Sequence, residues 1–204
     1  MTVLISGVYK PAMTQELTQY FYSDGALSSE GVQDATGKQG EWKFYYAEGQ
    51  INVVENYKAN ELEGVSLSYY QNGQLKSEEN WHLGLQEDSA YYYYETGQLH
   101  RKGMYIASLY TGIWLSYHEN GRLKSKGGYA MGLPDGLWEV YAEDGLILQK
   151  GYYKEGKEHG YWEFYDGNGR INFSGSYQNG KEIGEWYEYS RKGKKRLYYD
   201  YSEK

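Results

Sequence analysis

Apolar and aromatic residues recur along this chain at a constant interval, and each interval is marked by one glycine that never changes place. This glycine occurs every 24 residues, at Gly25, Gly49, Gly73, Gly97, Gly121, Gly145, Gly169 and Gly193. A period kept over eight copies without insertion or deletion is typical of a structural unit that stacks on neighbours of its own kind. The chain is therefore predicted to form one elongated repeat domain rather than one or two globules.

Each unit contains two short apolar runs on either side of that glycine. We number the unit from position 0, which holds glycine in most copies, for example Gly40 and Gly160, so that the invariant glycine is position 9. Position 5 is always aromatic, as in Tyr45, while position 11 is Leu or Ile and position 17 is aromatic in all but one copy each. The runs are rich in tyrosine and bounded by turn residues, which predicts the two strands of a β-hairpin and not a helix.

The loop inside each hairpin is predicted from the residue that precedes the invariant glycine. A type I′ turn would force that residue to a positive φ, which strains Glu48, Lys192 and above all the β-branched Thr96. A three-residue loop at positions 7 to 9, formed by a type I turn and a bulge at the glycine, avoids this strain. In the expected register, position 5 faces position 11 and position 1 faces position 15. Positions 5, 11 and 17 would then share one face, and positions 4 and 6 the opposite face.

Composition limits how such hairpins are held together. The chain has 27 Tyr, 27 Gly and 6 Trp, but only 2 Pro, and it has few aliphatic residues for a thick core. We therefore expect backbone ladders and stacked rings to stabilise it. The net charge of −7 argues against nucleic acid as the main partner, and the lack of cysteine excludes disulfides and thiolate metal sites. No stretch approaches the ~20 apolar residues of a membrane span, and a cytoplasmic location is expected.

The first residues of the chain fall half-way through a unit. Gly7 and Tyr9 occupy positions 15 and 17, so residues 1–15 are predicted to be a half repeat or an N-terminal cap. The alternative is that a segment upstream of Met1, such as a signal, is missing. The first fifteen residues themselves have no signal-peptide pattern. Residues 16–204 are predicted to form the hairpin array, with the last unit, where Lys195 replaces the usual Leu or Ile, as the C-terminal cap.

The clearest units resemble a known repeat family. The segment from Gly151 to Tyr165, GYYKEGKEHGYWEFY, resembles a MORN repeat, whose signature is an aromatic, a Gly-Lys turn and a second glycine followed by aromatics. The pattern Gly-x-Trp-x-x-Tyr followed by Asn-Gly-x-Leu is closer to the MORN-repeat variant of bacterial proteins, including the YwqK-type antitoxin family of toxin–antitoxin systems. Ser66 and Ala90 depart from the pattern where it has Trp, and Asp88 departs where it has Gly, so the middle units are expected to be less regular.

This resemblance extends from Gly7 to the end of the chain and implies an all-β fold. The expected architecture is an elongated, twisted array of about eight 24-residue MORN-type β-hairpins in a single-layer open sheet. The resemblance also implies a role in binding, since arrays of this family serve as scaffolds, membrane-associated proteins, enzyme appendages and antitoxins.

No residue pattern in the chain predicts catalysis, a cofactor or a metal site. The four histidines occupy four different positions of the unit: His82, His100, His118 and His159. They do not form the convergent ligand set that a metal needs. Carboxylate pairs such as Glu78 and Glu79 are expected near strand ends, without the apolar pocket that acid–base catalysis requires. The Gly-Lys dipeptides lie between strands and lack the helix of a phosphate-binding loop. The chain is therefore predicted not to be an enzyme.

Two patterns remain as candidate binding features, and the first is a set of rings in the first half of the chain. Position 6 is Tyr in the first four units only, and position 4 is aromatic in three of these units. The candidate partner-binding residues are Tyr20, Tyr22, Phe44, Tyr46, Tyr70, Tyr92 and Tyr94. Tyrosine provides a large contact area at low entropic cost and is enriched in hot spots. The alternative is that these rings only pack on their neighbours.

The second pattern is cationic. Positions 12 and 14 of the middle units place several basic residues on one predicted face: Lys76, His100, Lys102, Lys124, Lys126 and Lys150. Such a stripe is suited to an acidic partner or to anionic lipid head groups at a membrane surface. The alternative is that these lysines provide solubility and protect the sheet, and Glu30 and Glu78 interrupt the stripe.

Large area, excess tyrosine and the absence of a catalytic pattern together predict a non-enzymatic protein-binding repeat module. The most specific version, which the family resemblance alone implies, is an antitoxin or immunity protein that neutralises a toxin by direct binding. The competing version is a structural or membrane-surface scaffold that binds anionic lipid or organises other proteins.

Overall fold

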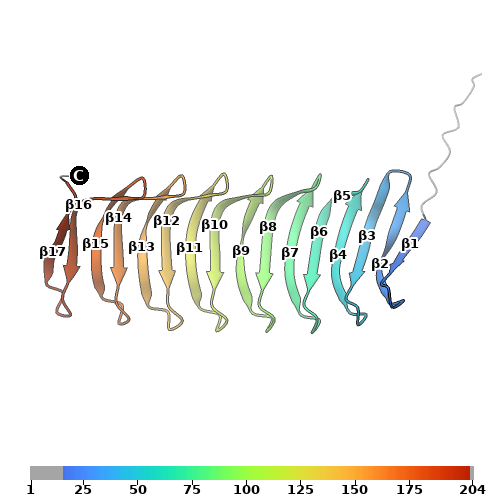
Figure 1. Cartoon of the computed structure of the whole chain (residues 1–204), viewed down its shortest axis with the longest axis horizontal. Helices are drawn as coiled ribbons and strands as arrows, with labels where there is room; N and C mark the ends of the chain where they lie inside the picture. Colours follow the sequence, from blue (N-terminus) through green and yellow to red (C-terminus); the bar gives the residue numbers. More distant parts are fainter. Residues whose placement is uncertain (1–15, 203–204) are drawn as a thin grey trace, which may run out of the picture.

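The computed structural model describes residues 16–202, and in this part of the chain all regular structure is β-strand (Figure 1). The strands are β1 (Glu16–Phe21), β2 (Leu27–Asp34), β3 (Gly37–Tyr45), β4 (Ile51–Lys58), β5 (Glu61–Leu62), β6 (Gly64–Tyr69), β7 (Leu75–His82), β8 (Leu85–Tyr93), β9 (Leu99–Ile106), β10 (Leu109–Tyr117), β11 (Leu123–Ala130), β12 (Leu133–Tyr141), β13 (Ile147–Lys154), β14 (Lys157–Tyr165), β15 (Ile171–Gln178), β16 (Lys181–Tyr189) and β17 (Lys195–Asp200).

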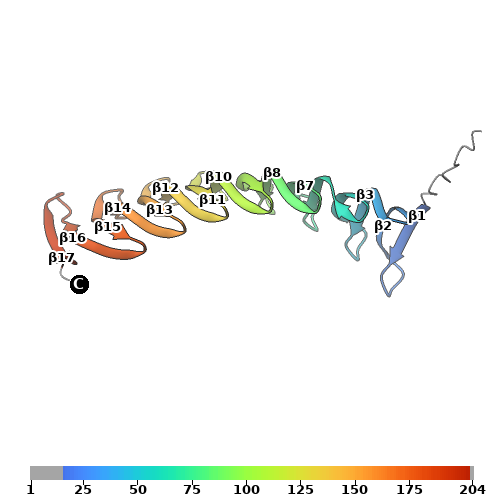
Figure 2. The same cartoon turned by 90° about the horizontal axis from the view of Figure 1, so that it is seen from above.

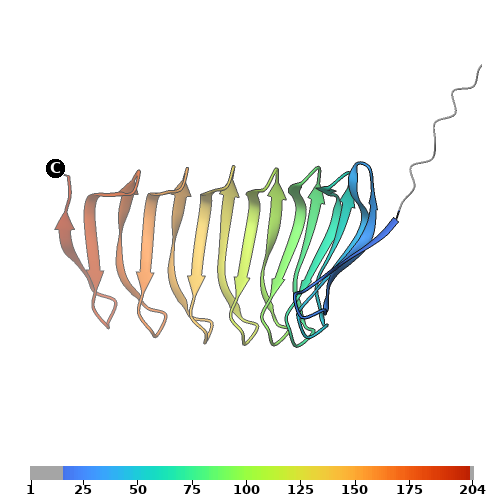
Figure 3. The same ribbon diagram turned by 45° about the vertical axis from the view of Figure 1, so that its right-hand side comes forward.

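Each strand pairs antiparallel with its neighbours in sequence, so the hairpins follow one another in a single row. Figure 2 shows that the row is one layer thick, and Figure 3 shows its twist near β1. β4 pairs with both β5 and β6, because Glu63 interrupts one strand and donates its N–H to the Asn56 carbonyl at 2.8 Å. The predicted elongated, single-layer array is confirmed. The half repeat or cap predicted for residues 1–15 lies outside the described residues, and the C-terminal cap stays a prediction.

The three-residue loop predicted for each hairpin is also confirmed. In the second unit Gly49 N–H donates to the Tyr46 carbonyl at 2.9 Å, and Tyr46 N–H donates to the Gln50 carbonyl at 2.8 Å. Gly49 has a φ of +91°, whereas Thr96, which precedes the equivalent glycine two units later, does not adopt a positive φ. We call the edge of the sheet that carries these loops the loop edge; it is the lower edge in Figure 1.

The predicted register beyond the loop was wrong. Tyr45 faces Ile51 as expected, but a bulge follows, and Phe44 then faces Val53. The extra residue shifts every later pair, so that position 2, not position 1, faces position 15. It also reverses which side chains share a face, because side chains alternate along a strand. Position 17 therefore lies with positions 2 and 4, on what we call the tryptophan face, and position 5 lies on the opposite, open face.

The tryptophan face is built on contacts between indoles and glycines of the preceding hairpin. Gly151 on β13 lies beside Trp162 on β14, and a Cβ at this glycine would overlap the indole ring. The indole N–H of Trp162 donates to the Tyr152 carbonyl at 3.1 Å, which ties β14 to β13 by a side chain as well as by the backbone. The same contact recurs in the pairs Gly31–Trp42, Gly103–Trp114, Gly127–Trp138 and Gly175–Trp186. Trp42 is 0% exposed and Trp162 2% exposed, although the sheet has only one layer.

Position 17 fills the space between successive indoles. Tyr153 packs edge-on against Trp138 and Trp162, with ring centroids 5.6 and 5.1 Å apart, and Tyr177 repeats the arrangement with Trp162 and Trp186 at 6.0 and 5.0 Å. Edge-to-face pairs at this separation are favourable beyond the area that they bury. The core of the protein is therefore a line of rings along one face.

The two middle units without tryptophan at position 2 keep the array by a compensating exchange. Glu79 replaces the glycine of position 15, and it faces Ser66 on one side and Ala90 on the other, the two residues that replace Trp. Small residues leave room for the longer side chain. The Glu79 carboxylate accepts hydrogen bonds from Tyr92 Oη at 2.5 Å and Gln86 Nε2 at 2.8 Å. The middle units thus depart from the pattern without losing the fold.

We expect Gly151→Ala to lower the free energy of unfolding by about 2 kcal/mol or more, because the new methyl group overlaps the Trp162 indole. Chemical denaturation of the full chain measures this loss. The matched control is Gly167→Ala, which adds the same group where a Cβ meets nothing within 4 Å, and it should change stability by no more than about 0.5 kcal/mol. Equal effects of both substitutions would contradict the role of the indole–glycine contact.

Candidate interaction surfaces

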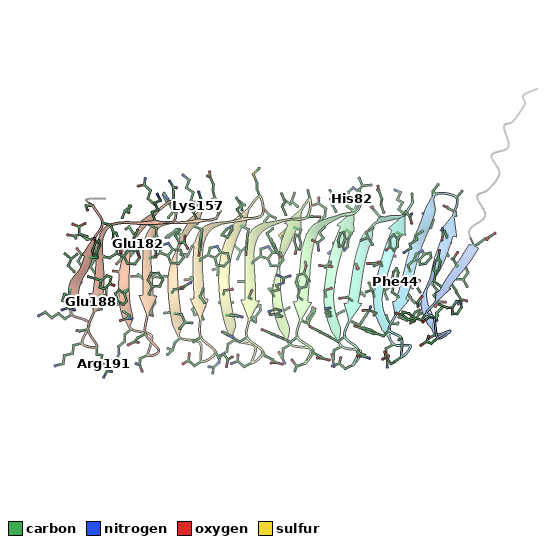
Figure 4. All side chains as sticks on the ribbon, viewed as in Figure 1. Phe44, His82, Lys157, Glu182, Glu188 and Arg191 are labelled. Atoms are coloured by element: carbon green, nitrogen blue, oxygen red, sulfur yellow. The ribbon has the colours of Figure 1, made fainter. Side chains whose placement is uncertain are left out.

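The rings predicted at position 4 lie on the tryptophan face and pack against its indoles. Tyr20 and Phe44 flank Trp42 with ring centroids 6.2 and 6.4 Å away, and Tyr92 stacks 6.4 Å from Trp114. Phe44, labelled in Figure 4, is also covered by the Lys38 ammonium 4.6 Å above its ring. These contacts give the three rings a structural role. Whether they also bind a partner stays a prediction.

The tyrosines of position 6 lie at the loop edge, where each hydroxyl bonds to the next unit. Tyr22 donates to the Tyr45 carbonyl at 2.5 Å. Tyr46, Tyr70 and Tyr94 donate at 2.8 Å to the carbonyls of Tyr69, Tyr93 and Tyr117 respectively. Position 6 therefore forms a ladder that links successive hairpins, and the seven rings do not form the single row that the predicted register implied.

The structure also explains why this ladder stops after the first half. In the fifth unit His118 Nε2 lies 2.9 Å from the Tyr141 carbonyl and takes the place of the tyrosine hydroxyl. In the seventh unit Asp166 accepts from the N–H groups of Asn168 and Arg170, and in the eighth Ser190 accepts from Lys194. Asp166 and Ser190 thus close their own loops instead of reaching the next, and Ala142 in the sixth unit has no side-chain polar group for either role. A structural demand that is met in different ways accounts for an asymmetry that the sequence alone associates with binding.

The lysines of positions 12 and 14 are divided between two environments. Lys102, Lys126 and Lys150 lie on the open face, in a cross-strand row that continues through Leu115, Glu139 and Glu163. Lys150 Nζ lies 2.8 Å from a Glu163 carboxylate oxygen, and this contact, the first of several, raises the pKa of Lys150. Acidic residues thus neutralise the C-terminal half of the row.

The other two lysines occupy the bulge beside the loop edge. Lys76 lies 5.7 Å from the Tyr70 ring centroid, and Lys124 holds the same position two units later. His100, also at this position, lies 4.4 Å from the Tyr94 ring. Their predicted contact with an anion or lipid remains untested.

An exposed apolar band on the open face was not found by sequence reasoning. It consists of Met104, Ile113, Leu137, Tyr152 and Tyr161, which lie on β9 to β14 and are between 40 and 53% exposed. We call these five residues the open-face band. They occupy positions 1 and 16 of the unit. Position 16 lies two residues after the lysines of position 14, so both share a face; this spacing is visible in the sequence, but the wrong register hid which residues of the facing strand join them.

Two shallow hollows lie along the open-face band. One, of about 390 Å³, is lined by Leu137, Tyr152 and Tyr161 together with Lys150 and Glu163. The other, of about 190 Å³, is lined by Met104 and Ile113 together with Lys102 and Tyr91. Apolar floors with charged margins are typical of protein-binding surfaces.

The perturbed ionisable groups belong to structural contacts. Hydrogen bonds from Gln19 and Tyr45 hold the pKa of Glu30 below its usual range. Burial, followed by the hydrogen bond to Glu30, raises the pKa of Tyr45 to about 12. Burial likewise raises the pKa of Tyr92 to about 12. Among residues 16–202 no three His, Asp or Glu side chains are placed to share a metal ion. No helix able to span a bilayer occurs in the same residues.

Comparison with protein families identifies the repeat. The sequence matches the MORN repeat variant in five segments, residues 38–59, 62–82, 89–107, 110–130 and 134–155. The chain belongs to the MORN repeat variant family. Each matched segment covers one hairpin, from β3–β4 to β12–β13, and the structure continues the same hairpins on both sides of the matched region. The comparison with curated proteins gives no significant match.

Several solved structures are distantly similar to this MORN repeat protein. A crystal structure of TcdB2–TccC3–TEV is 18% identical over 90% of this chain, with a TM-score of 0.23, and the match covers 10% of that chain. A protein of unknown function from Bacteroides fragilis is 11% identical over 92% of this chain and 90% of its own, with a TM-score of 0.12. The present chain thus spans about a tenth of the length of the first of these proteins.

We expect the double substitution Tyr46→Phe and Tyr70→Phe to lower the free energy of unfolding by about 1–2 kcal/mol, because two carbonyls of the next units lose their donors. Thermal or urea unfolding measures the effect. Tyr152→Phe, at an exposed position of the open-face band, is the control and should leave stability within about 0.5 kcal/mol. An unchanged stability of the double variant would mean that the hydroxyl ladder does not stabilise the array.

Proposed function

We propose that this MORN repeat protein is a non-enzymatic module that binds another protein through the open face of its sheet. The observation that carries the proposal is the open-face band, which consists of two exposed apolar groups on either side of Gly128: Met104 with Ile113, and Leu137 with Tyr152 and Tyr161. Single exposed apolar residues are ordinary, but apolar groups gathered along one face with charged margins are typical of an interaction site. The opposite face already uses its rings as the core, so the open face is the broad surface left for a partner.

The most specific form of the proposal is that the protein is an antitoxin or immunity protein that neutralises a toxin by direct binding. It is supported by the resemblance of the Gly-x-Trp-x-x-Tyr and Asn-Gly-x-Leu patterns to YwqK-type antitoxins. A rigid array suits this role, because an inhibitor that is already ordered loses little conformational entropy on binding. We propose a cytoplasmic location for this activity, and a toxin as the partner.

The proposal predicts that the full-length protein, used as bait in its native organism, retains one protein stoichiometrically. Ile113→Glu combined with Leu137→Glu should weaken binding of that protein by at least tenfold, because both changes place charge in the apolar contact, and tenfold corresponds to about 1.4 kcal/mol. Isothermal titration with the purified partner measures the change. If the partner is a toxin, the wild type but not the variant should suppress its activity.

Two controls make this experiment decisive. Val65→Glu places the same charge on the open face but outside the band, and it should leave binding within twofold. Tyr22→Ser tests the ring set, whose members stay proposed contacts. Loss of binding by Tyr22→Ser but not by the band variant would reject the open face and favour the rings, and failure to retain any protein would reject the binding proposal.

The second candidate function is a membrane-surface scaffold. The lysine row favours it, since Lys102 and Lys126 lie on either side of Leu115 on the open face. We expect weak binding to phosphatidylserine vesicles in sedimentation, lost between low and ~0.5 M salt because exposed charges are screened. Strong vesicle binding that Lys102→Ala with Lys126→Ala abolishes would favour the scaffold over the protein-binding role.

A further inference from the structure

Three consecutive turns between hairpins expose large aliphatic side chains. We call the edge that carries these two-residue turns the turn edge; it is the upper edge in Figure 1. The turns β7–β8, β9–β10 and β11–β12 each present two such residues, and together they form what we call the turn ridge: Leu83, Leu85, Ile106, Leu109, Met131 and Leu133. Met131 is 85% exposed and Leu83 58% exposed.

The turn ridge is continuous and has sharp ends. Leucine at position 21 covers the next turn along the edge, since a Cβ at Gly132 would lie 3.2 Å from Leu109 Cδ2 and one at Gly156 would lie 3.6 Å from Leu133 Cδ2. The same position holds Glu61 in the turn before the ridge and Lys157 in the turn after it. Large aliphatic residues at position 21 are thus confined to three turns, and the other turns have Gly37, Glu61, Lys157 and Lys181 there.

The backbone of these turns makes the aliphatic residues costly. Leu83 has a φ of +49° and Met131 a φ of +50°, a region that disfavours side chains of this kind and favours Gly, Asn and Asp. Asn179 holds the equivalent position of a later turn, with a φ of +54°. The same positive φ occurs outside the ridge at Ala59 and Glu155, so this strain is common to the turns. What distinguishes the ridge is that its turns expose large apolar side chains, which do not stabilise the monomer.

The turns offer little backbone to an additional strand, because five of their six N–H groups already have acceptors, those of Leu83, Gly84, Ala107, Ser108 and Gly132. Gly84 N–H donates to the Leu62 carbonyl at 3.0 Å, Ser108 N–H to Gln86 at 2.9 Å and Gly132 N–H to Tyr110 at 3.0 Å. The remaining N–H of the turn at Leu83 donates to a Glu63 carboxylate at 3.1 Å. An occupant of the turn ridge must therefore bind through side chains alone and satisfy its own backbone.

We infer that the turn ridge is the docking site for an amphipathic α-helix of the partner protein. Neighbouring turns are separated by two strand spacings, ~9.6 Å, and seven residues of an α-helix rise about 10.5 Å. Each turn presents two aliphatic side chains, which matches the two apolar residues per seven of a helix that buries a narrow stripe. A helix of about 15 to 20 residues lying along the edge would contact all three turns.

Charge gives the expected polarity of this helix. Beyond the last turn of the ridge the edge carries Lys154 and Lys157, and Lys181 follows in the next turn; Figure 4 shows Lys157 pointing outward from this edge. Glu155 is the one exposed acidic residue between the first two. The end of the helix that lies over these lysines is therefore expected to be acidic.

The surroundings of the turn ridge favour a helix over a lipid surface. The carboxylates of Glu63 and Glu87 lie directly behind the turns, where they accept from the N–H groups of Leu83 and Ala107 at 3.1 and 2.9 Å. Insertion into an anionic leaflet would bring these carboxylates, and a chain of net charge −7, against lipid phosphates. A discrete helix covers the aliphatic residues without that repulsion.

The test uses the full-length protein and a synthetic fluorescein-labelled peptide of 21 residues, with Leu at two positions of each heptad, Ala and Gln elsewhere and Glu at one end. Fluorescence anisotropy should show saturable binding to the wild type and at least tenfold weaker binding to the variant Leu83→Asn with Met131→Asn. The variant should have an unchanged or higher Tm, because asparagine tolerates the positive φ of both positions. Loss of peptide binding without loss of stability would show that Leu83 and Met131 serve binding and not folding.

Ala59→Asn is the matched control, at the same position of the turn that precedes the ridge, with a φ of +50°. It should bind the peptide within twofold of the wild type, and a peptide of the same composition with its leucines scrambled should not bind. Equal binding by the wild type and the ridge variant would overturn the inference. The inference would also be overturned if phosphatidylserine vesicles sedimented the wild type but not the ridge variant and the peptide bound neither protein.

This inference rests on the proposed function, and the two fail separately. If the wild type retains its natural partner and the ridge variant retains it equally, the protein-binding role stands and the helix site is rejected. If the peptide binds at the ridge but the wild type retains no protein from its native organism, the site has the expected chemistry and the proposed function is rejected. Weaker retention of the natural partner by the ridge variant, with retention preserved in Ala59→Asn, supports both.

Discussion

The contact between an indole and the glycine of the preceding hairpin is the interaction on which the array depends. A single-layer sheet has no second layer to bury its side chains, so each unit must bury its tryptophan against its neighbour. Gly151 gives Trp162 that space, and the indole N–H then ties the two hairpins at the Tyr152 carbonyl. Since Tyr153 and Tyr177 fill the gaps between indoles, one local contact, repeated, produces the only thick packing among the described residues.

This mode of packing separates the two faces by role. Rings on the tryptophan face contact one another and its indoles are buried, as at Trp42 and Trp162, whereas the open face and the turn edge carry side chains that stabilise little within the monomer. Ile113 is 53% exposed and Met131 85% exposed, so burial accounts for neither residue, and the positive φ of Met131 disfavours its side chain. Residues retained without a structural reason are the best guide to function in a repeat, because the other copies show what structure alone requires.

The departures from the repeat support the same distinction. The pair Glu79 and Ala90 takes the place of a glycine–tryptophan pair and keeps the register. His118 takes the place of a tyrosine in the ladder at the loop edge. Both are structural exchanges with a visible compensation. Leu83 and Met131 of the turn ridge have none, since both are exposed and Asn179 shows that a polar residue suits the same backbone. A position that varies is therefore informative only after its neighbours have been inspected.

The sequence by itself determined the period, the hairpin, the loop at Gly49 and the single-layer array, because these follow from local turn chemistry and from repetition. It did not determine which side chains share a face. One extra residue, Asn52 at the bulge after Ile51, moves position 17 to the side of Trp42, and the direction of every later side chain in the strand follows. Only the tertiary structure, in which indoles select the register that places glycine beside them, decides that the first-half rings pack and that Ile113 and Leu137 face outward. The physical reason is that alternation has a period of two, so a shift of one residue reverses the face while leaving every local pattern intact.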